Sequence, residues 1–245
     1  MLQREYIFTE TAGSTNTLLK QAARGGAPLF RVICAGRQTA GRGRTGRSFF
    51  SPAGGIYFSA SYPFEKTPPG LARLTLLAGL TVCRVLEAAA PLTVKWPNDI
   101  MLHGKKVCGI LTETVYCGEK PTAILGVGIN ASLPAGEIPP PLREKMTSFT
   151  AEGLSAPPVR DTVRAIVSAL DREVYENNAL AGDFAPYLEA YRARDHLIGK
   201  PVSRTLPGGA VLSGVAAGIS ASGGLLVRTE AGETAEITFG EVETG

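Results

Sequence analysis

Residues 93–130 contain four β-rich segments joined by short connections: TVKWPNDIMLHGKKVCGILTETVYCGEKPTAILGVGIN. TVKW and DIML flank the turn-forming pair Pro97-Asn98, and HGKK turns the chain again into the apolar segment 107–116. One more strand follows at 122–132. A parallel crossover needs about a dozen residues or more, and several of these connections are much shorter. The segments are therefore predicted to form a mixed, largely antiparallel sheet.

Helical patterns on both sides of this stretch are expected to back the sheet. They cover residues 13–24, 71–90 and 160–178, with a short final helix that Asp183 caps and that runs through Tyr191. Ser14 and Thr15 are capping candidates for the first helix, and the long 71–90 segment is nearly uncharged, which is typical of a helix buried against a sheet. Two further β-rich runs lie at 30–36 and 56–64. The predicted fold class is α+β.

The pattern changes from Leu197 onward. Short β-rich runs now alternate with glycine-rich turns, which predicts a small all-β module. We therefore expect two domains, at residues 1–196 and 197–245. A module of this size has only a marginal core of its own, so it should lean on the larger domain.

The composition excludes several classes of protein. Hydrophobic residues at 44% and charged residues at 19% are ordinary for a globular chain, and no apolar run approaches the roughly 18 residues that span a bilayer. A net charge of +3 is too small to indicate a nucleic-acid binder. Two histidines and no G-x-S-x-G motif argue against a Ser/His/Asp hydrolase. The cysteines form no C-x-x-C pair, which argues against zinc, and the first residues lack a secretory pattern, so a cytoplasmic protein is expected.

The segment GRGRTG at residues 41–46 matches the dinucleotide-binding pattern G-x-G-x-x-G, but the context is wrong. That pattern needs a helix directly after it, whereas SFFSPAGG follows here and opposes a helix. A Walker motif also fails, because Arg42 stands where its lysine belongs. Glycines still let backbone N–H groups approach an anion, and Arg42, Arg44 and Arg47 add planar donors for phosphate or carboxylate. We predict a loop that closes over a phosphate-bearing ligand, mobile when empty; the alternatives are a solvated basic loop or an RNA-binding tract.

The first interpretation of the segment KWPNDI, at residues 95–100, is an ordinary turn formed by Pro-Asn-Asp. The segment nevertheless brings together a lysine, an amide and a carboxylate, the groups that hold phosphates and a magnesium ion. GVGIN, at 126–130, is read as a core strand whose glycines admit a close neighbour.

Six segments in this order, GSTN, AGRGRTGR preceded by Gln38, SPAGG, KWPNDI, KKVCGIL and GVGIN, resemble the biotin protein ligases, or biotin–acetyl-CoA-carboxylase ligases. The resemblance is dense over residues 11–132, and the terminal FGEV is similar to the family's C-terminal domain. It implies a mixed seven-stranded sheet backed by helices and a small barrel-like domain. It also implies ATP, Mg²⁺ and a two-step reaction: biotin forms biotinyl-5′-AMP, and a lysine of a biotin carboxyl carrier protein then takes the biotinyl group.

The resemblance also assigns roles to single residues. The positions that match the family's contacts to biotin and to the covering loop are Ser14, Thr15, Asn16, Gln38, Gly41, Arg42, Gly43, Arg44, Lys106 and Gly109. Those on the ATP side are Arg44, Arg47, Phe49, Lys95, Asn98 and Asn130, with Asp99 as the magnesium partner. Lys106, Arg42 and Arg44 are the catalytic candidates.

The chain departs from the family pattern at two points. Phe49 stands where the family usually has a tryptophan that helps to wall the adenine. The first motif begins near residue 13, which leaves no room for the helix-turn-helix of bifunctional members, so we expect no specific DNA binding. A lipoate or octanoate ligase of the same fold and a non-enzymatic nucleic-acid binder are the competing functions, and a homodimer is left open.

Overall fold

The computed structural model describes residues 2–26, 30–206 and 208–244, and a seven-stranded sheet forms its centre. The strands are β1 (Glu5–Ala12), β2 (Arg31–Gln38), β3 (Ile56–Pro63), β4 (Thr93–Lys95), β5 (Asp99–Leu102), β6 (Lys105–Cys117) and β7 (Lys120–Ile129). Their order across the sheet is β1-β2-β3-β7-β6-β5-β4. Only the β1–β2 pair is parallel, and the other neighbours are antiparallel. The mixed, largely antiparallel sheet is thus confirmed.

Tight turns fix the antiparallel half of the sheet. His103 and Gly104 adopt φ values of 49° and 81° between β5 and β6, the left-handed pair that suits a two-residue hairpin. Cys117 pairs with Lys120 across the turn from β6 to β7, and Gly118 has a φ of 65° there. Each turn sets the register of the strands that follow it, and so places the residues of β6 and β7 opposite one another.

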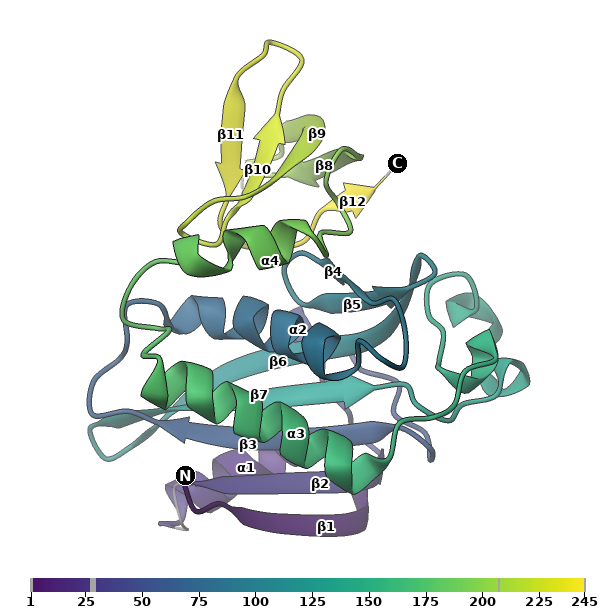
Figure 1. The fold of residues 1–245 in the computed structure, drawn as a ribbon, viewed down its shortest axis with the longest axis vertical. Coiled ribbons are helices and arrows are strands. Elements are labelled where there is room, and N and C mark those ends of the chain that lie inside the picture. Colours follow the sequence, from purple (N-terminus) through teal and green to yellow (C-terminus); the bar gives the residue numbers. More distant parts are fainter. Residues whose placement is uncertain (1, 27–29, 207, 245) are drawn as a thin grey trace.

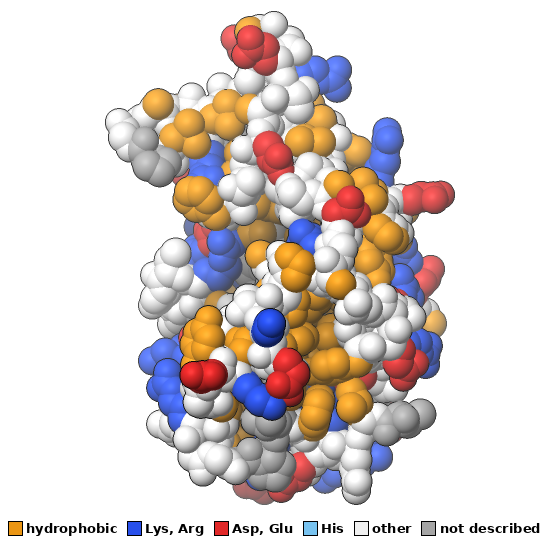
Figure 2. Space-filling model, turned by 90° about the vertical axis from the view of Figure 1, so that its left-hand side faces the viewer, with side chains coloured by type: hydrophobic (Ala, Val, Ile, Leu, Met, Phe, Trp, Pro, Cys, Tyr) orange, Lys and Arg blue, Asp and Glu red, His pale blue; other side chains and the backbone are white. Residues whose placement is uncertain are grey.

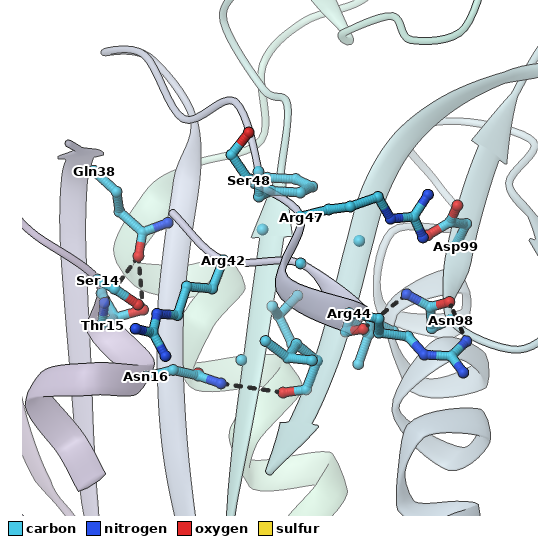
Figure 3. A pocket seen from close by; sticks show the side chains of 18 of the residues that line it. Ser14, Thr15, Asn16, Gln38, Arg42, Arg44, Arg47, Ser48, Asn98 and Asp99 are labelled. Atoms are coloured by element: carbon cyan, nitrogen blue, oxygen red, sulfur yellow. Dashed lines mark hydrogen bonds between the residues drawn. The ribbon is translucent and has the colours of Figure 1, made fainter. Parts of the chain in front are cut away.

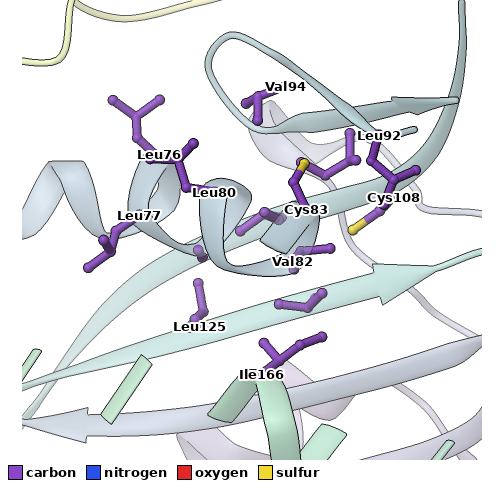
Figure 4. Packing of buried hydrophobic residues seen from close by; sticks show 14 of the residues in the cluster. Leu76, Leu77, Leu80, Val82, Cys83, Leu92, Val94, Cys108, Leu125 and Ile166 are labelled. Carbon is purple, nitrogen blue, oxygen red and sulfur yellow. The ribbon is translucent and has the colours of Figure 1, made fainter. Parts of the chain in front are cut away.

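Helices cover both faces of the sheet. They are α1 (Thr15–Arg24), α2 (Leu74–Val85), α3 (Val159–Asp171) and α4 (Leu188–Arg192). Figure 1 shows α2 and α3 crossing one face while α1 lies behind the sheet. Buried side chains of α2 pack against Cys108 of β6, Leu125 of β7 and Ile166 of α3 (Figure 4). Because α2 is buried on nearly all sides, its sequence carries almost no charge.

Shorter turns complete the chain. A π-helical segment, Arg172–Glu176, continues α3, and 3₁₀ turns lie at Arg44–Gly46, Leu71–Arg73, Ala135–Glu137, Pro140–Leu142, Thr150–Glu152 and Ala185–Tyr187. None of the helices in the described part of the chain is long and apolar enough to cross a membrane. On the face seen in Figure 2, basic and acidic side chains are interspersed.

A second sheet carries the last strands, which we call the C-terminal β-module: β8 (Pro201–Thr205), β9 (Val211–Ile219), β10 (Leu225–Arg228), β11 (Thr234–Ile237) and β12 (Glu243–Thr244). Their order is β11-β10-β9-β8-β12, antiparallel throughout. The module sits above α2 and α4 in Figure 1. Trp96 Nε1 donates to Gly223 O at 3.0 Å and Phe184 N donates to Ala221 O at 2.7 Å. The module therefore leans on the larger sheet, as its small size predicts.

Most predicted elements are present, with three differences. Strand β1 is absent from the sequence-based prediction; in the structure Ala12 is its one buried residue, so the strand contributes little to the core. The predicted 71–90 helix is regular only over Leu74–Val85. Asp183 lies one residue before Phe184, the N-cap of the 3₁₀ turn, and accepts a hydrogen bond from Ala185 N at 3.0 Å, whereas α4 begins at Leu188 without a side-chain cap.

Candidate active site

A cavity of about 180 Å³ opens over β6 and β7, between the start of α1 and the β4–β5 turn. Residues 42–49 cover it. Its lining consists of Ser14, Thr15, Asn16, Gln38, Arg42, Gly43, Arg44, Arg47, Ser48, Phe49, Phe58, Asn98, Asp99, Lys106, Gly109, Ile110, Leu111, Gly126, Val127, Gly128 and Glu241. In Figure 3 the α1 residues and Gln38 stand at one end with Arg42 beside them, and Arg44 and Arg47 reach toward Asn98 and Asp99 at the other end.

The α1 end is a buried polar cluster. Ser14 caps the helix, and its Oγ accepts from Thr17 N at 3.4 Å. Gln38 Oε1 accepts from Thr15 N at 2.8 Å and from Thr15 Oγ1 at 3.2 Å, so the amide must turn Nε2 toward Ser51 Oγ, 3.1 Å away. One Nε2 hydrogen of Gln38 and the hydroxyl hydrogen of Ser14 stay available to a ligand. Both are donors, so this end suits an acceptor oxygen.

The floor of the cavity is bare backbone. It is formed by three glycines, Gly109 of β6 and Gly126 and Gly128 of β7. A side chain packs directly on each of them, and a Cβ atom at any of the three would displace it. A Cβ at Gly126 would lie 2.3 Å from Asn16 Oδ1, and Cβ atoms at Gly109 and Gly128 would lie 2.7 Å and 2.6 Å from the Phe49 ring. The ring rests on this floor and meets Tyr57 edge-on at a centroid distance of 6.5 Å. GVGIN thus admits a close neighbour, as its glycines predict.

The far end of the cavity is cationic. Arg44 Nη1 donates to Asn98 Oδ1 and to Gly240 O, both at 3.2 Å, and Arg47 pairs with Glu241. Burial lowers the pKa of the Arg44 guanidinium, and the charges of Arg47 and Arg204 act in the same direction, while the carboxylate of Asp99 opposes them.

Lys106 completes this cationic end. Its Nζ lies 2.7 Å from Asp99 Oδ1 and 5.5 Å from the centroid of the Phe49 ring. Both backbone polar groups of Lys106 are hydrogen-bonded to the segment 145–147: Lys106 N donates to Lys145 O and Lys106 O accepts from Thr147 N, each at 2.9 Å. The ammonium therefore projects into the site from a fixed strand.

The loop over the site is a small hairpin. Gly43 N donates to Arg47 O at 2.7 Å, and Arg42 pairs with Ser48 as an isolated bridge. Thr45 and Gly46 adopt φ values of 52° and 78°, which closes the turn between them. The expectation that this loop is mobile without ligand and ordered with it stays a prediction.

Three of the residues predicted for the site lie outside the lining. Gly41 lies at the base of the loop, where a Cβ would come 2.4 Å from Phe49 O. Lys95 belongs to β4, paired with Asp99 across the turn. Asn130 is buried directly after the end of β7, with Nδ2 donating to Thr147 O at 2.9 Å. All other predicted site residues meet at the cavity.

Several lining residues were missed by sequence reasoning. For Gly126 and Gly128 the sequence did hold a usable pattern, since two glycines two residues apart in one strand lie on the same face of the sheet. For Glu241 the sequence held no such pattern, because this residue belongs to the C-terminal β-module, far from the other lining residues in the chain. In the described part of the chain no three His, Cys, Asp or Glu side chains gather as a ready-made metal site.

Comparison with known proteins fits this geometry. A sequence model of the biotin/lipoate A/B protein ligase family matches residues 9–130, and one of the biotin protein ligase C-terminal domain matches residues 197–245. The chain is 34% identical to the biotin–[acetyl-CoA-carboxylase] ligase of Mycobacterium tuberculosis, over 98% of this chain and 88% of that protein. It is 32% identical to the bifunctional ligase/repressor BirA of Bacillus spizizenii, over 100% of this chain and 75% of the relative.

A solved structure, biotin protein ligase from Aquifex aeolicus in complex with biotin and ATP, superposes with a TM-score of 0.82 at 28% identity and covers 98% of both chains. The fold, the matched sequence models and the full-length relatives agree. The chain belongs to the biotin/lipoate A/B protein ligase family, as a biotin protein ligase.

Proposed function

We propose that this protein activates biotin with ATP as biotinyl-5′-AMP and transfers the biotinyl group to a lysine of a biotin carboxyl carrier protein. The observation that carries this is the polarity of the cavity. Donors cluster at the α1 end, bare backbone and Phe49 form the middle, and Lys106, Arg44 and Arg47 stand at the other end. Biotin has the same order: a polar ring, an apolar chain and a carboxylate that must meet phosphate.

The polar ring of biotin fits the α1 end. Its ureido oxygen accepts hydrogen bonds, and Ser14 and Gln38 each have a hydrogen free for it. Arg42, on the loop above, adds a guanidinium at the same end of the cavity. We assign these three residues to the ring, with Thr15 holding Gln38 in the orientation that exposes its donor.

The reaction requires two anions to approach each other. Biotin's carboxylate oxygen attacks the α-phosphorus of ATP, the P–O bond to pyrophosphate breaks, and pyrophosphate leaves. Lys106 is placed to stabilise the charge where carboxylate and α-phosphate meet, because fixed cations cost little reorganisation during the reaction. In the second step, an acceptor lysine amine attacks the mixed anhydride and AMP leaves.

The remaining cations and polar groups belong to the nucleotide side. Arg44 and Asn98 form one unit through their hydrogen bond, and Arg47 can exchange Glu241 for phosphate. Asn130 and Lys95 lie behind this surface. We propose that Asn130 acts through Thr147, whose segment holds the backbone of Lys106.

Magnesium fits this site only together with the nucleotide. Mg²⁺ is commonly bound by one or two carboxylates plus substrate phosphates, not by a cage of protein ligands. Asp99 supplies such a carboxylate beside Lys106, and bound Mg²⁺ would neutralise phosphate charge there. We propose Asp99 as its protein ligand.

The test is pyrophosphate release. The wild-type protein should release pyrophosphate only with biotin and ATP together, and Lys106→Ala should lower that rate by about 10²–10³. Lys105→Ala is the matched control, because Lys105 is half-buried like Lys106 but its ammonium donates to Arg143 O at 2.8 Å, and Lys105 does not line the cavity. Release with lipoate or octanoate instead of biotin would favour the lipoate-ligase alternative, and a wild-type rate in Lys106→Ala would remove Lys106 from the reaction.

A further inference from the structure

Glu113 is a carboxylate beside the site that none of the sequence motifs singled out. It lies on β6 with 27% of its side chain exposed, two residues after Leu111 of the cavity lining. Lys20 Nζ of α1 donates to its Oε1 at 2.5 Å, and Asn16 Nδ2 donates to its Oε2 at 2.9 Å. Both oxygens of Glu113 therefore face α1.

Asn16 is the residue through which Glu113 reaches the site. Its Nδ2 donates to Glu113 and to Leu111 O, at 2.9 Å and 3.4 Å, and its Oδ1 accepts from Ser59 Oγ at 2.5 Å. Both amide hydrogens are thus directed at protein oxygens, which leaves none for a ligand. The bare backbone of Gly126 makes room for this side chain.

Asn16 follows directly after the two residues that form the donor end of the cavity. It lies in the first turn of α1, next to Thr15 and Ser14, and it ties that turn to β3 through Ser59 and to β6 through Glu113. Whatever fixes the Asn16 amide also fixes where the first turn of α1 stands over the sheet.

We propose that Glu113, held by Lys20, is a positioning residue for biotin: it locks the Asn16 amide and thereby sets the place of Ser14 and Thr15. The inference rests on the proposed role of this cavity as the biotin site. Glu113 does not touch the ligand in this account. Its effect should therefore be on biotin affinity, not on the nucleotide.

The chemistry of a carboxylate explains why glutamate suits this position. An ionised carboxylate only accepts hydrogen bonds, so it can face two donors at once, whereas a glutamine amide would turn an N–H toward either Asn16 Nδ2 or Lys20 Nζ. Burial would raise the pKa of Glu113, but hydrogen bonds from Lys20 and Asn16 outweigh it, and the pKa lies below its usual value. The group is thus ionised at neutral pH.

The first variant is Glu113→Gln. Titration calorimetry should show biotin binding weakened by about 10- to 100-fold, the effect expected when a hydrogen bond to a charged group is lost, while ATP binding changes less than about twofold. Glu119→Gln is the control, because Glu119 is an exposed acid in the turn at the end of the same strand. It should leave both affinities unchanged.

The second variant reverses the polarity of the pair. In Asn16→Asp combined with Glu113→Gln, the glutamine amide can donate to the new aspartate while its oxygen accepts from Lys20, and Ser59 still donates to residue 16. Biotin affinity should recover part of the loss seen in Glu113→Gln, because the donors and acceptors of residues 16, 20 and 113 are matched again, while Leu111 O loses the donor that Asn16 offers it at 3.4 Å. The rescue would show that residues 16 and 113 act as a pair, and the selective loss of biotin affinity over ATP affinity separates positioning from a general loss of stability.

The outcomes separate the two claims. Unchanged biotin affinity in Glu113→Gln, an equal loss for biotin and ATP, or no rescue in the double variant would each overturn the positioning role. If the wild-type protein itself bound no biotin, the proposed function would fail instead.

Discussion

At the scale of single residues, Phe49 joins the loop over the site to the floor of the cavity. Its ring does not stand free at the rim of the cavity. It rests on the backbone of Gly109 and Gly128, with Lys106 Nζ 5.5 Å from its centroid. The ring and the glycines are complementary, and neither can change without the other.

Gly128→Ala tests this complementarity. The added methyl group would lie 2.6 Å from Phe49 Cε1, so we expect a loss of about 1–3 kcal/mol in the free energy of unfolding, as for other overpacked sites. In a Phe49→Ala background the same substitution should cost much less. Urea denaturation of the two single variants and the double variant measures the difference; an equal cost in both backgrounds would contradict the packing.

At the scale of elements, the segment after α4 behaves as an extra edge of the sheet. Val94 N donates to Arg194 O at 2.7 Å, and His196 N donates to Val94 O at 2.9 Å. The His196 ring sits against Thr93 Oγ1 and Lys200 Nζ, each at 3.1 Å. This pairing fixes where the chain leaves the larger sheet for the C-terminal β-module.

The environment of His196 predicts a pH dependence of stability. Burial, with the charges of Lys200 and Lys95, lowers the pKa of His196 to about 4 from its usual 6.5. Between these pH values the His196 imidazole is protonated in the unfolded chain but neutral in the folded protein. The free energy of unfolding should therefore fall as pH drops from about 6.5 toward 4. Denaturation at pH 7.5 and 5 should show a smaller fall in His196→Gln, and an identical fall would contradict the assignment.

At the scale of the whole molecule, the C-terminal β-module reaches the active site. Its turn around Gly223 accepts the indole N–H of Trp96, which belongs to the KWPNDI segment. Its last turn contacts the arginine loop, through Gly240 O on Arg44 and Glu241 on Arg47. The module is thus one wall of the site.

Trp96→Phe removes the donor of the first contact and leaves a carbonyl without its partner. We expect a stability loss of about 0.5–1.5 kcal/mol, the usual net contribution of one hydrogen bond, because this bond is only partly buried. Hydrogen exchange should locate it: amides of β9 and β10 should lose protection while those of β6 and β7 keep theirs. Equal loss in both sheets would mean that Trp96 supports the main core instead.

Local patterns were enough to predict most of the elements. Helix α1 with its Ser14 cap, the strands around Pro97-Asn98 and the β-rich module after Leu197 each appear within a window of a few residues, because hydrophobic period and turn chemistry are properties of neighbours in the chain. Short connections predicted the antiparallel half of the sheet for the same reason. The motifs that resemble the family also lie in single short segments, and most of their residues meet at one cavity.

The sequence by itself therefore determined the α+β class, the antiparallel stretch around residues 93–130 and many of the residues that line the cavity. Only the tertiary structure decided the parallel pairing of β1 with β2, the packing of Phe49 on the glycine floor, and the parts that Glu113 and Glu241 take beside the cavity. These depend on partners far apart in the chain: Glu113 meets Asn16, and Glu241 meets Arg47. A short stretch of sequence cannot predict such a contact, because the two residues come together only when the chain has folded.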